Sequence, residues 1–333
     1  MRKKTETTKT MRVLWLAMLA LLLMTGTALR AQTSDEVWDG SVASSFDGGS
    51  GTESDPYLIS NGAQLAKLAQ DVNGGNNYSG KYFRLTADIM LNNTEGWENW
   101  NENTKGLNQW TAIGYVSEND KKRFSGIFDG GNHTISGIYI NTTTSRQGLF
   151  GCIHKSTVQN LSATKSYINT KDSYVGGIVG MSESSNIKYC QNDATVKGKY
   201  YVGGIVGGTY YVNNYVVSCL NTGKVIGPSN TTIGGKIGGI VGTNGGVITS
   251  CINIGSVSGE NSCGEIVGHN SFQVTNCYYL SGSNYEGIGS GSSGNTVEKT
   301  EEKFANGEVC WLLNNESNEN PVWFQTLEID KTP

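Results

Sequence analysis

The apolar positions in the second half of this chain recur at regular intervals around one short glycine-centred phrase. A looser version, Gly148-Leu-Phe-Gly151, precedes the regular copies. Equivalent residues of successive versions lie 29, 27, 35 and 26 positions apart, which is the period of a chain wound into stacked coils. The pattern therefore predicts a solenoid. The regular copies are Val175-Gly-Gly-Ile-Val-Gly180, Val202-Gly-Gly-Ile-Val-Gly207, Ile237-Gly-Gly-Ile-Val-Gly242 and Cys263-Gly-Glu-Ile-Val-Gly268.

A second set of apolar positions stays in register with this phrase. Each repeat has a Cys or Leu with a β-branched residue three positions earlier, and three repeats have a Val six positions later. Such residues suit a pleated, half-buried surface, and equivalent positions on neighbouring coils lie about 4.8 Å apart. We therefore expect ladders of like side chains inside the coils. The positions are Val158, Ile187, Val216, Ile248 and Val274, then Leu161, Cys190, Cys219, Cys251 and Cys277, then Val196, Val225 and Val257.

The glycine pairs are expected at corners, where the backbone needs positive φ or comes close to the coil above. Longer repeats are expected to place their extra residues in loops, and residues 228–236 account for the longest step. With 45 Gly, 4 Pro and 16% charged residues, the composition indicates a β-rich chain with many turns. We expect one elongated domain, because each coil of a solenoid contacts only its neighbours.

Both ends of the solenoid are expected to be capped. Leu65, Leu68, Ala69 and Val72 fall on one face of a short helix over residues 61–73, which we interpret as an N-terminal lid over the β-helix of residues 55–296. Residues 32–54 are rich in Ser, Gly and Asp, and we expect a flexible linker. Residues 297–333 are expected to form a C-terminal capping helix, with Gly307 as its weak point, and an extended tail.

The first 31 residues have the features of a signal peptide. A basic start is followed by an apolar run over residues 13–24 and by small residues near Ala31. No Cys follows, so we expect no lipoprotein anchor, and no later segment is apolar enough to cross a membrane. Removing residues 1–31 takes the formal net charge from −4 to −9. An acidic mature chain argues against nucleic acid or anionic lipid as the main partner.

These residues carry a family resemblance. The glycine phrases and the Cys-containing segments after them resemble the GLUG-motif repeats of secreted and surface bacterial proteins, particularly of the Bacteroides type. The lead-in that precedes such repeats is matched by Asp55-Pro-Tyr-Leu-Ile-Ser60, Trp110-Thr-Ala-Ile-Gly114 and Phe128-Asp-Gly130. The resemblance implies an all-β, right-handed parallel β-helix, usually in a surface protein of adhesin-like or unassigned role and sometimes in an accessory region of a peptidase. It supplies no catalytic residue, and it leaves open whether the chain is a shortened member.

Many parallel β-helices cleave polysaccharides, which requires paired carboxylates. Asp172 and Glu260 occupy the same place relative to the phrase, but they lie three coils apart, or roughly 14 Å at the strand spacing. Paired glycosidase carboxylates are about 5 to 9.5 Å apart. A catalytic pair in the repeats is therefore not expected. The lead-in coils hold further acids and a histidine, namely Asp88, Glu118, Asp120, Asp129 and His133.

Each of the remaining candidate residues has a structural interpretation beside the functional one. We expect Asp129 to cap its own turn and His133 to lie at a coil edge. Trp97, Trp100 and Trp110 either stack on sugar rings or belong to an insertion folded over its own aromatic residues. His154 and His269 stand at different offsets from the phrase, so no metal column is expected.

The seven cysteines leave two possibilities open. Neighbouring rungs of the ladder are close enough for disulfides such as Cys190–Cys219 or Cys251–Cys277, but parallel side chains favour buried free thiols. Cys152, Cys263 and Cys310 lie outside the ladder.

The sequence thus predicts an exported, non-enzymatic surface or interaction module. Its coil faces, rich in Asn, Thr, Ser and Tyr, would present hydrogen-bonding groups to a glycan or to a host or bacterial surface protein. We expect no catalytic residue, cofactor or metal, and the ligand-binding residues are unknown at this stage. The alternatives are a polysaccharide-degrading enzyme that uses Asp129, and a structural stalk.

Overall fold

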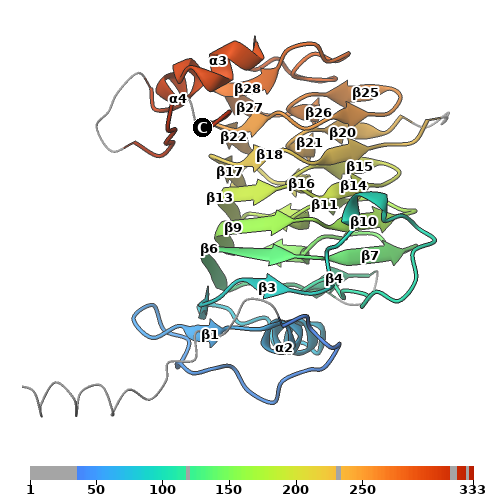
Figure 1. The fold of residues 1–333 in the computed structure, drawn as a ribbon, viewed down its shortest axis with the longest axis vertical. Coiled ribbons are helices and arrows are strands. Elements are labelled where there is room, and N and C mark those ends of the chain that lie inside the picture. Colours follow the sequence, from blue (N-terminus) through green and yellow to red (C-terminus); the bar gives the residue numbers. More distant parts are fainter. Residues whose placement is uncertain (1–35, 118–120, 230–233, 316–320, 328–329) are drawn as a thin grey trace, which may run out of the picture. The chain divides into compact units, whose positions relative to one another are not determined.

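The computed structural model of the protein describes residues 36–117, 121–229, 234–315, 321–327 and 330–333. The signal peptide predicted over residues 1–31 lies outside them. The chain divides into two units, residues 1–36 and residues 37–333, and every element below belongs to the second. This unit is a parallel β-helix with few helices, as the recurring phrase predicts (Figure 1). None of the described helices is long and apolar enough to cross a membrane.

Four parallel sheets run along the axis of the coils, and the chain visits them in turn (Figure 1). The first sheet is the largest and carries the Cys ladder. Its strands are β1 (Tyr57–Ile59), β2 (Tyr82–Leu85), β3 (Ile89–Met90), β6 (Ile127–Ser136), β9 (Thr157–Thr164), β13 (Asn186–Asn192), β17 (Tyr215–Val217), β18 (Leu220–Asn221), β22 (Val247–Thr249), β23 (Ile252–Asn253), β27 (Gln273–Thr275), β28 (Cys277–Leu280) and β29 (Thr296–Lys299).

The other three parallel sheets complete each coil. The second sheet comprises β7 (Tyr139–Thr142), β10 (Tyr167–Thr170), β14 (Thr195–Lys197), β19 (Lys224–Ile226) and β24 (Val257–Ser258). The third comprises β11 (Val175–Gly176), β15 (Tyr201–Gly203), β20 (Lys236–Gly238) and β25 (Ser262–Gly264). The fourth comprises β8 (Phe150–His154), β12 (Val179–Glu183), β16 (Val206–Tyr210), β21 (Val241–Asn244) and β26 (Val267–Asn270). A short antiparallel pair, β4 (Tyr115–Val116) and β5 (Lys121–Lys122), lies beside them.

The predicted ladders are confirmed by the strand register. Ile187 pairs with Val158 on one neighbouring coil and with Val216 on the other, and Cys190 pairs with Leu161. These side chains are 0–1% exposed and belong to one continuous core. All seven cysteines are free thiols.

Each coil turns a corner between the two inner ladders of the first sheet. Residues three positions apart on a flat strand point to opposite faces, yet Ile187 and Cys190 both point inward. Tyr189, directly before Cys190, has φ +57°, and this left-handed residue bends the strand so that both side chains reach the core. The residue before each of the remaining Cys or Leu rungs is also left-handed; these residues are Asn160, Ser218, Ser250 and Asn276.

The glycine pairs serve close approach rather than positive φ. Neither glycine of the pair in the phrase has positive φ, so close approach is the one of the two expected reasons that applies. A Cβ on Gly177 would lie 2.5 Å from the carbonyl oxygen of Gly204 on the next coil. A Cβ on Gly180 would lie 2.7 Å from the carbonyl carbon of Arg146. Only glycine lets the third and fourth sheets stack this tightly.

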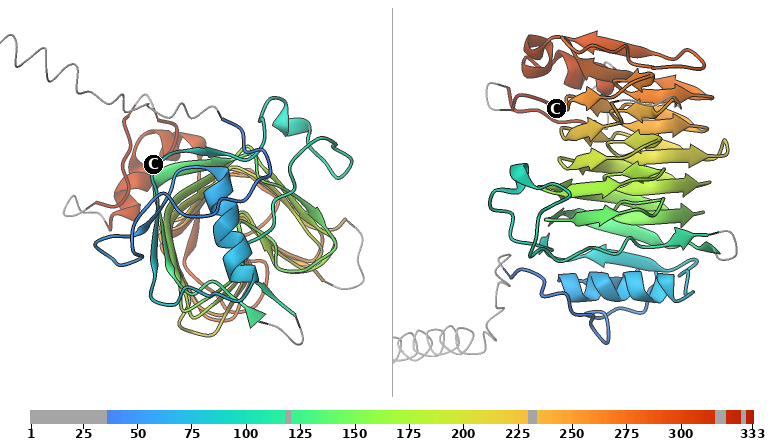
Figure 2. Two further views of the ribbon diagram at one scale, coloured as in Figure 1. Left: turned by 90° about the horizontal axis from the view of Figure 1, so that it is seen from below. Right: turned by 90° about the vertical axis from the view of Figure 1, so that its right-hand side faces the viewer.

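The N-terminal lid is helix α2 (Gly62–Asn73), which lies across the first coil (Figure 2). Asn61 caps it by accepting a hydrogen bond from the backbone N–H of Gln64 at 3.0 Å. Leu65, Leu68 and Val72 are fully buried, so the helix covers apolar core that the first coil would otherwise expose.

The segment expected to be a flexible linker, residues 32–54, packs against this lid in its described part. The backbone N–H of Trp38 bonds to the carbonyl of Met90 at 2.8 Å, and its ring meets Trp110 edge-on at 5.7 Å. Phe46 joins a cluster with Tyr57 and Phe83. Its few aromatic residues anchor the segment, although its composition resembles a linker.

The C-terminal helix is broken at Gly307 into α3 (Glu301–Ala305) and α4 (Glu308–Leu313). Gly307 has φ +86°, a conformation that ends one helix and starts the other. Both helices lie outside the ring of coils, against the outer face of the first sheet (Figure 2). They cover an outward apolar column from three successive coils, Leu220, Ile252 and Tyr278.

Candidate functional site

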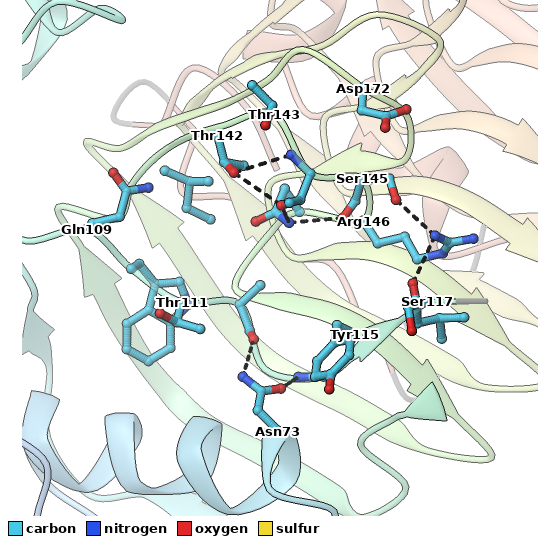
Figure 3. Close-up of a pocket in the computed structure, with 17 residues that line it drawn as sticks. Asn73, Gln109, Thr111, Tyr115, Ser117, Thr142, Thr143, Ser145, Arg146 and Asp172 are labelled. Carbon is cyan, nitrogen blue, oxygen red and sulfur yellow. Dashed lines mark hydrogen bonds between the residues drawn. The ribbon is translucent and has the colours of Figure 1, made fainter. Parts of the chain in front are cut away.

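A groove of about 930 Å³ opens beside the first coils, between the end of α2 and the loop after β7 (Figure 3). Most of its side chains are short and carry hydroxyl or amide groups, and two are charged. Such convergent polar groups in a concave surface are typical of a ligand site. The lining residues are Asn73, Gln109, Trp110, Thr111, Ala112, Gly114, Tyr115, Val116, Ser117, Ile140, Thr142, Thr143, Thr144, Ser145, Arg146, Gln147 and Asp172.

One wall of the groove is fixed to the N-terminal lid. Asn73, the last residue of α2, donates its amide N–H to the carbonyl of Ala112 at 3.1 Å and accepts the N–H of Gly114 at 2.9 Å. Gly114 has φ +83°, and a Cβ there would lie 3.0 Å from the carbonyl oxygen of Lys122. The segment before β4 therefore makes a tight turn at residue 114, where only glycine fits.

The opposite wall is the loop of residues 142–147, which is held by its own side chains. The hydroxyls of Thr142 and Thr144 lie 3.2 Å apart, and Gln147 donates its amide to the Thr144 hydroxyl at 3.0 Å. Thr170 on the next coil donates to the carbonyl of Thr144. Both walls are thus ordered by hydrogen bonds within the chain.

Arg146 lies at one side of the groove. Its Nη1 donates to the carbonyl of Val116 at 3.2 Å and to the hydroxyl of Ser145 at 2.9 Å, and its guanidinium carbon is 5.5 Å from the centre of the Tyr174 ring. No salt bridge joins it to a carboxylate among the described residues. Asp172, the one acid among the groove residues that the structure describes, accepts a hydrogen bond from Ser173 at 3.0 Å.

Asp129 and His133 take the structural roles predicted for them. Asp129 accepts the N–H of Gly131 at 3.0 Å and the amide of Asn160 at 2.9 Å, which confirms a turn cap. The ring of His133 lies 3.1 Å from the carboxylate of Asp88, which also accepts the backbone N–H of Thr134. Glu118 and Asp120 lie outside the described residues.

Asp172 and Glu260 are separated by intervening coils, as the repeat spacing predicts. Lys199, the equivalent residue on the next coil, donates its backbone N–H to the carbonyl of Asp172 at 3.1 Å. Asp172 lines the groove, and Glu260 is exposed outside it.

A cluster on the fourth sheet has the residue types of a catalytic site but not the chemistry. Glu183 pairs with Arg123 and lies 3.4 Å from His154 on the adjacent coil. Cys152 stands two residues before His154, but its thiol is fully buried and burial raises its pKa to about 12. A nucleophilic cysteine needs a lowered pKa. Among the described residues, no group of His, Cys, Asp and Glu is placed to hold a metal ion.

Two of the three candidate tryptophans, Trp97 and Trp100, belong to the insertion, and the third, Trp110, is buried. Trp110 is 2% exposed and has no free ring face. Trp100 meets Tyr139 edge-on at 6.1 Å, within an arm of residues 91–109 that includes the short 3-10 helix η1 (Trp97–Asn99). The arm folds over the second sheet, where Tyr139 donates its hydroxyl to the carbonyl of Asn101 at 2.9 Å. These contacts favour the insertion over a sugar platform.

Sequence reasoning did not find the groove. Its residues come from four separate segments. The sequence drew attention only to Asp172, the predicted helix that ends at Asn73, and the lead-in stretch of residues 110–114. The run of hydroxyl residues in Thr142-Thr-Thr-Ser-Arg146, directly before the first glycine phrase, is the signal that points to it in retrospect.

Comparisons with known proteins support the fold and give no family. No family model matches this chain. It is 30% identical over 189 residues, 55% of the chain, to Halomucin of Haloquadratum walsbyi. It is 33% identical over 144 residues, 41% of the chain, to a "Putative Gly-rich membrane protein" of Evansella cellulosilytica. These matches span only 2% and 14% of the two relatives' own lengths.

One solved structure is similar along most of the chain. It is described as a "putative immunoglobulin A1 protease" from Bacteroides ovatus, with a TM-score of 0.54, 20% identity, and coverage of 82% of this chain and 91% of that one. A likeness at this identity shows the fold alone, and the fold it supports is the parallel β-helix.

Proposed function

We propose that this chain is an exported, non-enzymatic β-helix module, of the GLUG-repeat type, that binds a glycan or a protein through the groove beside its first coils. The observation that carries the proposal is the groove itself, a concave surface of hydroxyl and amide side chains fixed to a rigid frame by Asn73 and by the loop of residues 142–147. A preordered site of this kind binds without first losing conformational freedom.

A binding role fits the charges of the groove better than hydrolysis does. Glycosidases need two carboxylates at matched distance, and among the described lining residues Asp172 is the only acid. Asp129, the acid that the enzymatic alternative would use, is occupied by two hydrogen bonds to its own turn and to Asn160.

Export rests on the amino-terminal sequence and on the relatives. Residues 1–31 have the charge and apolar pattern of a signal peptide, and one partial relative is named a membrane protein. A site on the outer surface of a secreted β-helix is open to ligands outside the cell.

The test fills the groove and measures binding of residues 32–333 to glycan and protein arrays. Thr143 is exposed in the groove, and its hydroxyl makes no hydrogen bond to another described residue, so Thr143→Trp adds bulk without removing such a contact. Thr52→Trp places the same bulk on an exposed turn outside the groove.

We expect Thr143→Trp to lose binding that the parent protein and Thr52→Trp both retain. Binding that survives Thr143→Trp, or no binding by the parent to either array, contradicts the proposal. Turnover of a polysaccharide by the parent chain would favour the enzymatic alternative.

A further inference from the structure

Beyond the groove, a cluster of tyrosines from two successive coils lies on the other side of Arg146. The rings of Tyr174 and Tyr201 stack at 4.4 Å with an interplanar angle of 26°. Tyr174 bonds through its hydroxyl to Tyr210, whose ring is tilted beside it at 5.8 Å. The ring centre of Tyr211 lies 6.5 Å from that of Tyr210. We call these four residues the tyrosine cluster.

The backbone of the coils holds the cluster in place. The start of the third sheet puts Tyr174 and Tyr201 at equivalent positions, because Val175 pairs with Val202. The Tyr174 ring lies over Gly208, where a Cβ would come within 3.0 Å of its Cδ1 atom. The two outer rings are the accessible ones, since Tyr210 is 40% exposed and Tyr211 is 65% exposed.

Arg146 connects the cluster to the groove. Its guanidinium lies over the Tyr174 ring on one side and bonds to the groove-lining residues Val116 and Ser145 on the other. These contacts use Nη1, and Nε lies 3.4 Å from the Met181 sulfur. Within the described residues Nη2 donates no hydrogen bond. The guanidinium is therefore held in position while its Nη2 can still donate hydrogen bonds to a ligand.

From this arrangement we infer that the groove and the tyrosine cluster form one extended site for an acidic sugar chain. A carboxylate on the chain bonds to the guanidinium of Arg146, while neighbouring sugar rings lie on Tyr210 and Tyr211. This inference rests on the proposed function, since it names the ligand class of the same groove.

Three features favour an acidic glycan over a protein segment. The planar guanidinium of Arg146 has no carboxylate partner in the part of the chain that the structure describes, and its geometry matches that of a carboxylate. Tyrosine offers an apolar ring face with a polar edge, and a pyranose ring presents the same combination. The groove beside them presents many hydroxyl and amide groups, which match sugar hydroxyls, alongside apolar side chains such as Trp110 and Ile140.

The test compares matched pairs of oligosaccharides on a glycan array and by calorimetry. Each pair is one uronic-acid oligomer and the same oligomer after its carboxyl groups are reduced to alcohols. We expect the parent protein to bind the acidic member at least tenfold more tightly, roughly 1.4 kcal/mol, with a preference that falls as salt is added.

Variants separate the two contacts. Arg146→Gln should remove the preference for the acid, so that the two members of a pair bind within about twofold of each other. Arg146→Lys should keep part of the preference, because the positive charge remains without the planar fork of donors. Tyr210→Ala should weaken both members of a pair roughly threefold to tenfold. The control Tyr189→Ala removes a ring that is also 40% exposed but lies on the first sheet, and should change neither.

The inference is overturned by equal binding of the two members of each pair, or by a preference for acid that persists in Arg146→Gln. Suppose that the protein binds neutral glycans, that Thr143→Trp abolishes this binding and that Arg146→Gln does not change it. This result would contradict the inference about acidic glycans and would leave the proposed function supported. A protein ligand with the same behaviour would do likewise. Binding that ignores Thr143→Trp sinks both.

Discussion

Glu265 interrupts the glycine phrase of the last regular coil and should make the stability of that coil depend on pH. In the other regular coils the same position is Gly177, Gly204 or Gly239. Glu265 is 3% exposed, and its carboxyl group accepts a hydrogen bond from the amide of Asn253 at 2.8 Å. Burial raises the pKa of Glu265 to about 7, although hydrogen bonds from Ser283 and Asn253 oppose the rise.

The direction of the effect follows from the two pKa values. The pKa of the group is 4.5 without its surroundings, so the folded chain binds the proton more tightly than the unfolded chain does. This contribution to stability is complete below about pH 4.5 and is lost as the pH rises through about 7. The difference corresponds to on the order of 3 kcal/mol at 1.36 kcal/mol per pKa unit.

Urea unfolding followed by circular dichroism at pH 5 and pH 8 measures this contribution. Glu265→Gln is neutral at both pH values and retains an acceptor for Asn253. We expect the variant to be slightly more stable than the parent at pH 5, which lies just above 4.5, and more stable by up to about 3 kcal/mol at pH 8. Glu260→Gln removes the same formal charge from an exposed position and should show no such gain. An equal pH dependence in the parent and in Glu265→Gln would refute the reasoning.

Two further predictions concern the inner ladders. In a buried row of amides, Asn221 accepts a hydrogen bond from Asn192 and donates one to Asn253, both at 2.8 Å. Asn221→Ala should lower the free energy of unfolding by roughly 2–4 kcal/mol, because it leaves buried groups unpaired. The control Asn103→Ala, at an exposed site, should not lower it, and equal urea midpoints for the two variants would contradict the prediction. Burial raises the pKa of Cys190 and Cys251, so a thiol reagent at pH 8 should modify half-buried Cys310 first and the ladder only on unfolding; rapid labelling of Cys190 in the folded protein, seen by peptide mass spectrometry, would show that the ladder is open.

The stacked coils were predictable from sequence because each coil repeats the same demands on its inner side chains. A β-branched residue and a Cys three positions later can both be buried only if the strand bends between them. The bend itself has no sequence signature, since Asn160, Tyr189, Ser218, Ser250 and Asn276 share the left-handed conformation but not their chemistry.

The position of the C-terminal helices was not predictable from their own residues. The apolar residues Phe304, Val309 and Leu313 indicate that one face of these helices is buried. They do not indicate which surface of the β-helix that face covers. The signal lies elsewhere, in the residue after each Cys rung. After Cys190 that residue is the polar Gln191, whereas after the next three cysteines it is the apolar Leu220, Ile252 or Tyr278. The helices cover these three apolar residues.

The groove escaped prediction for a related reason. Its walls come from the end of α2, the segment before β4 and the loop after β7, and only the stacking of the first coils brings them together. Arg146 gains its importance from its neighbours Val116 and Tyr174, which lie 30 and 28 positions away.

The central claim is that ligand binds in the groove beside the first coils, and amide hydrogen exchange with and without a retained glycan tests it most directly. We expect the ligand to slow exchange in residues 109–117 and 142–147, with weaker protection at residues 210–214. Slowed exchange confined to the C-terminal helices, or to the outer face of the first sheet, would contradict the claim.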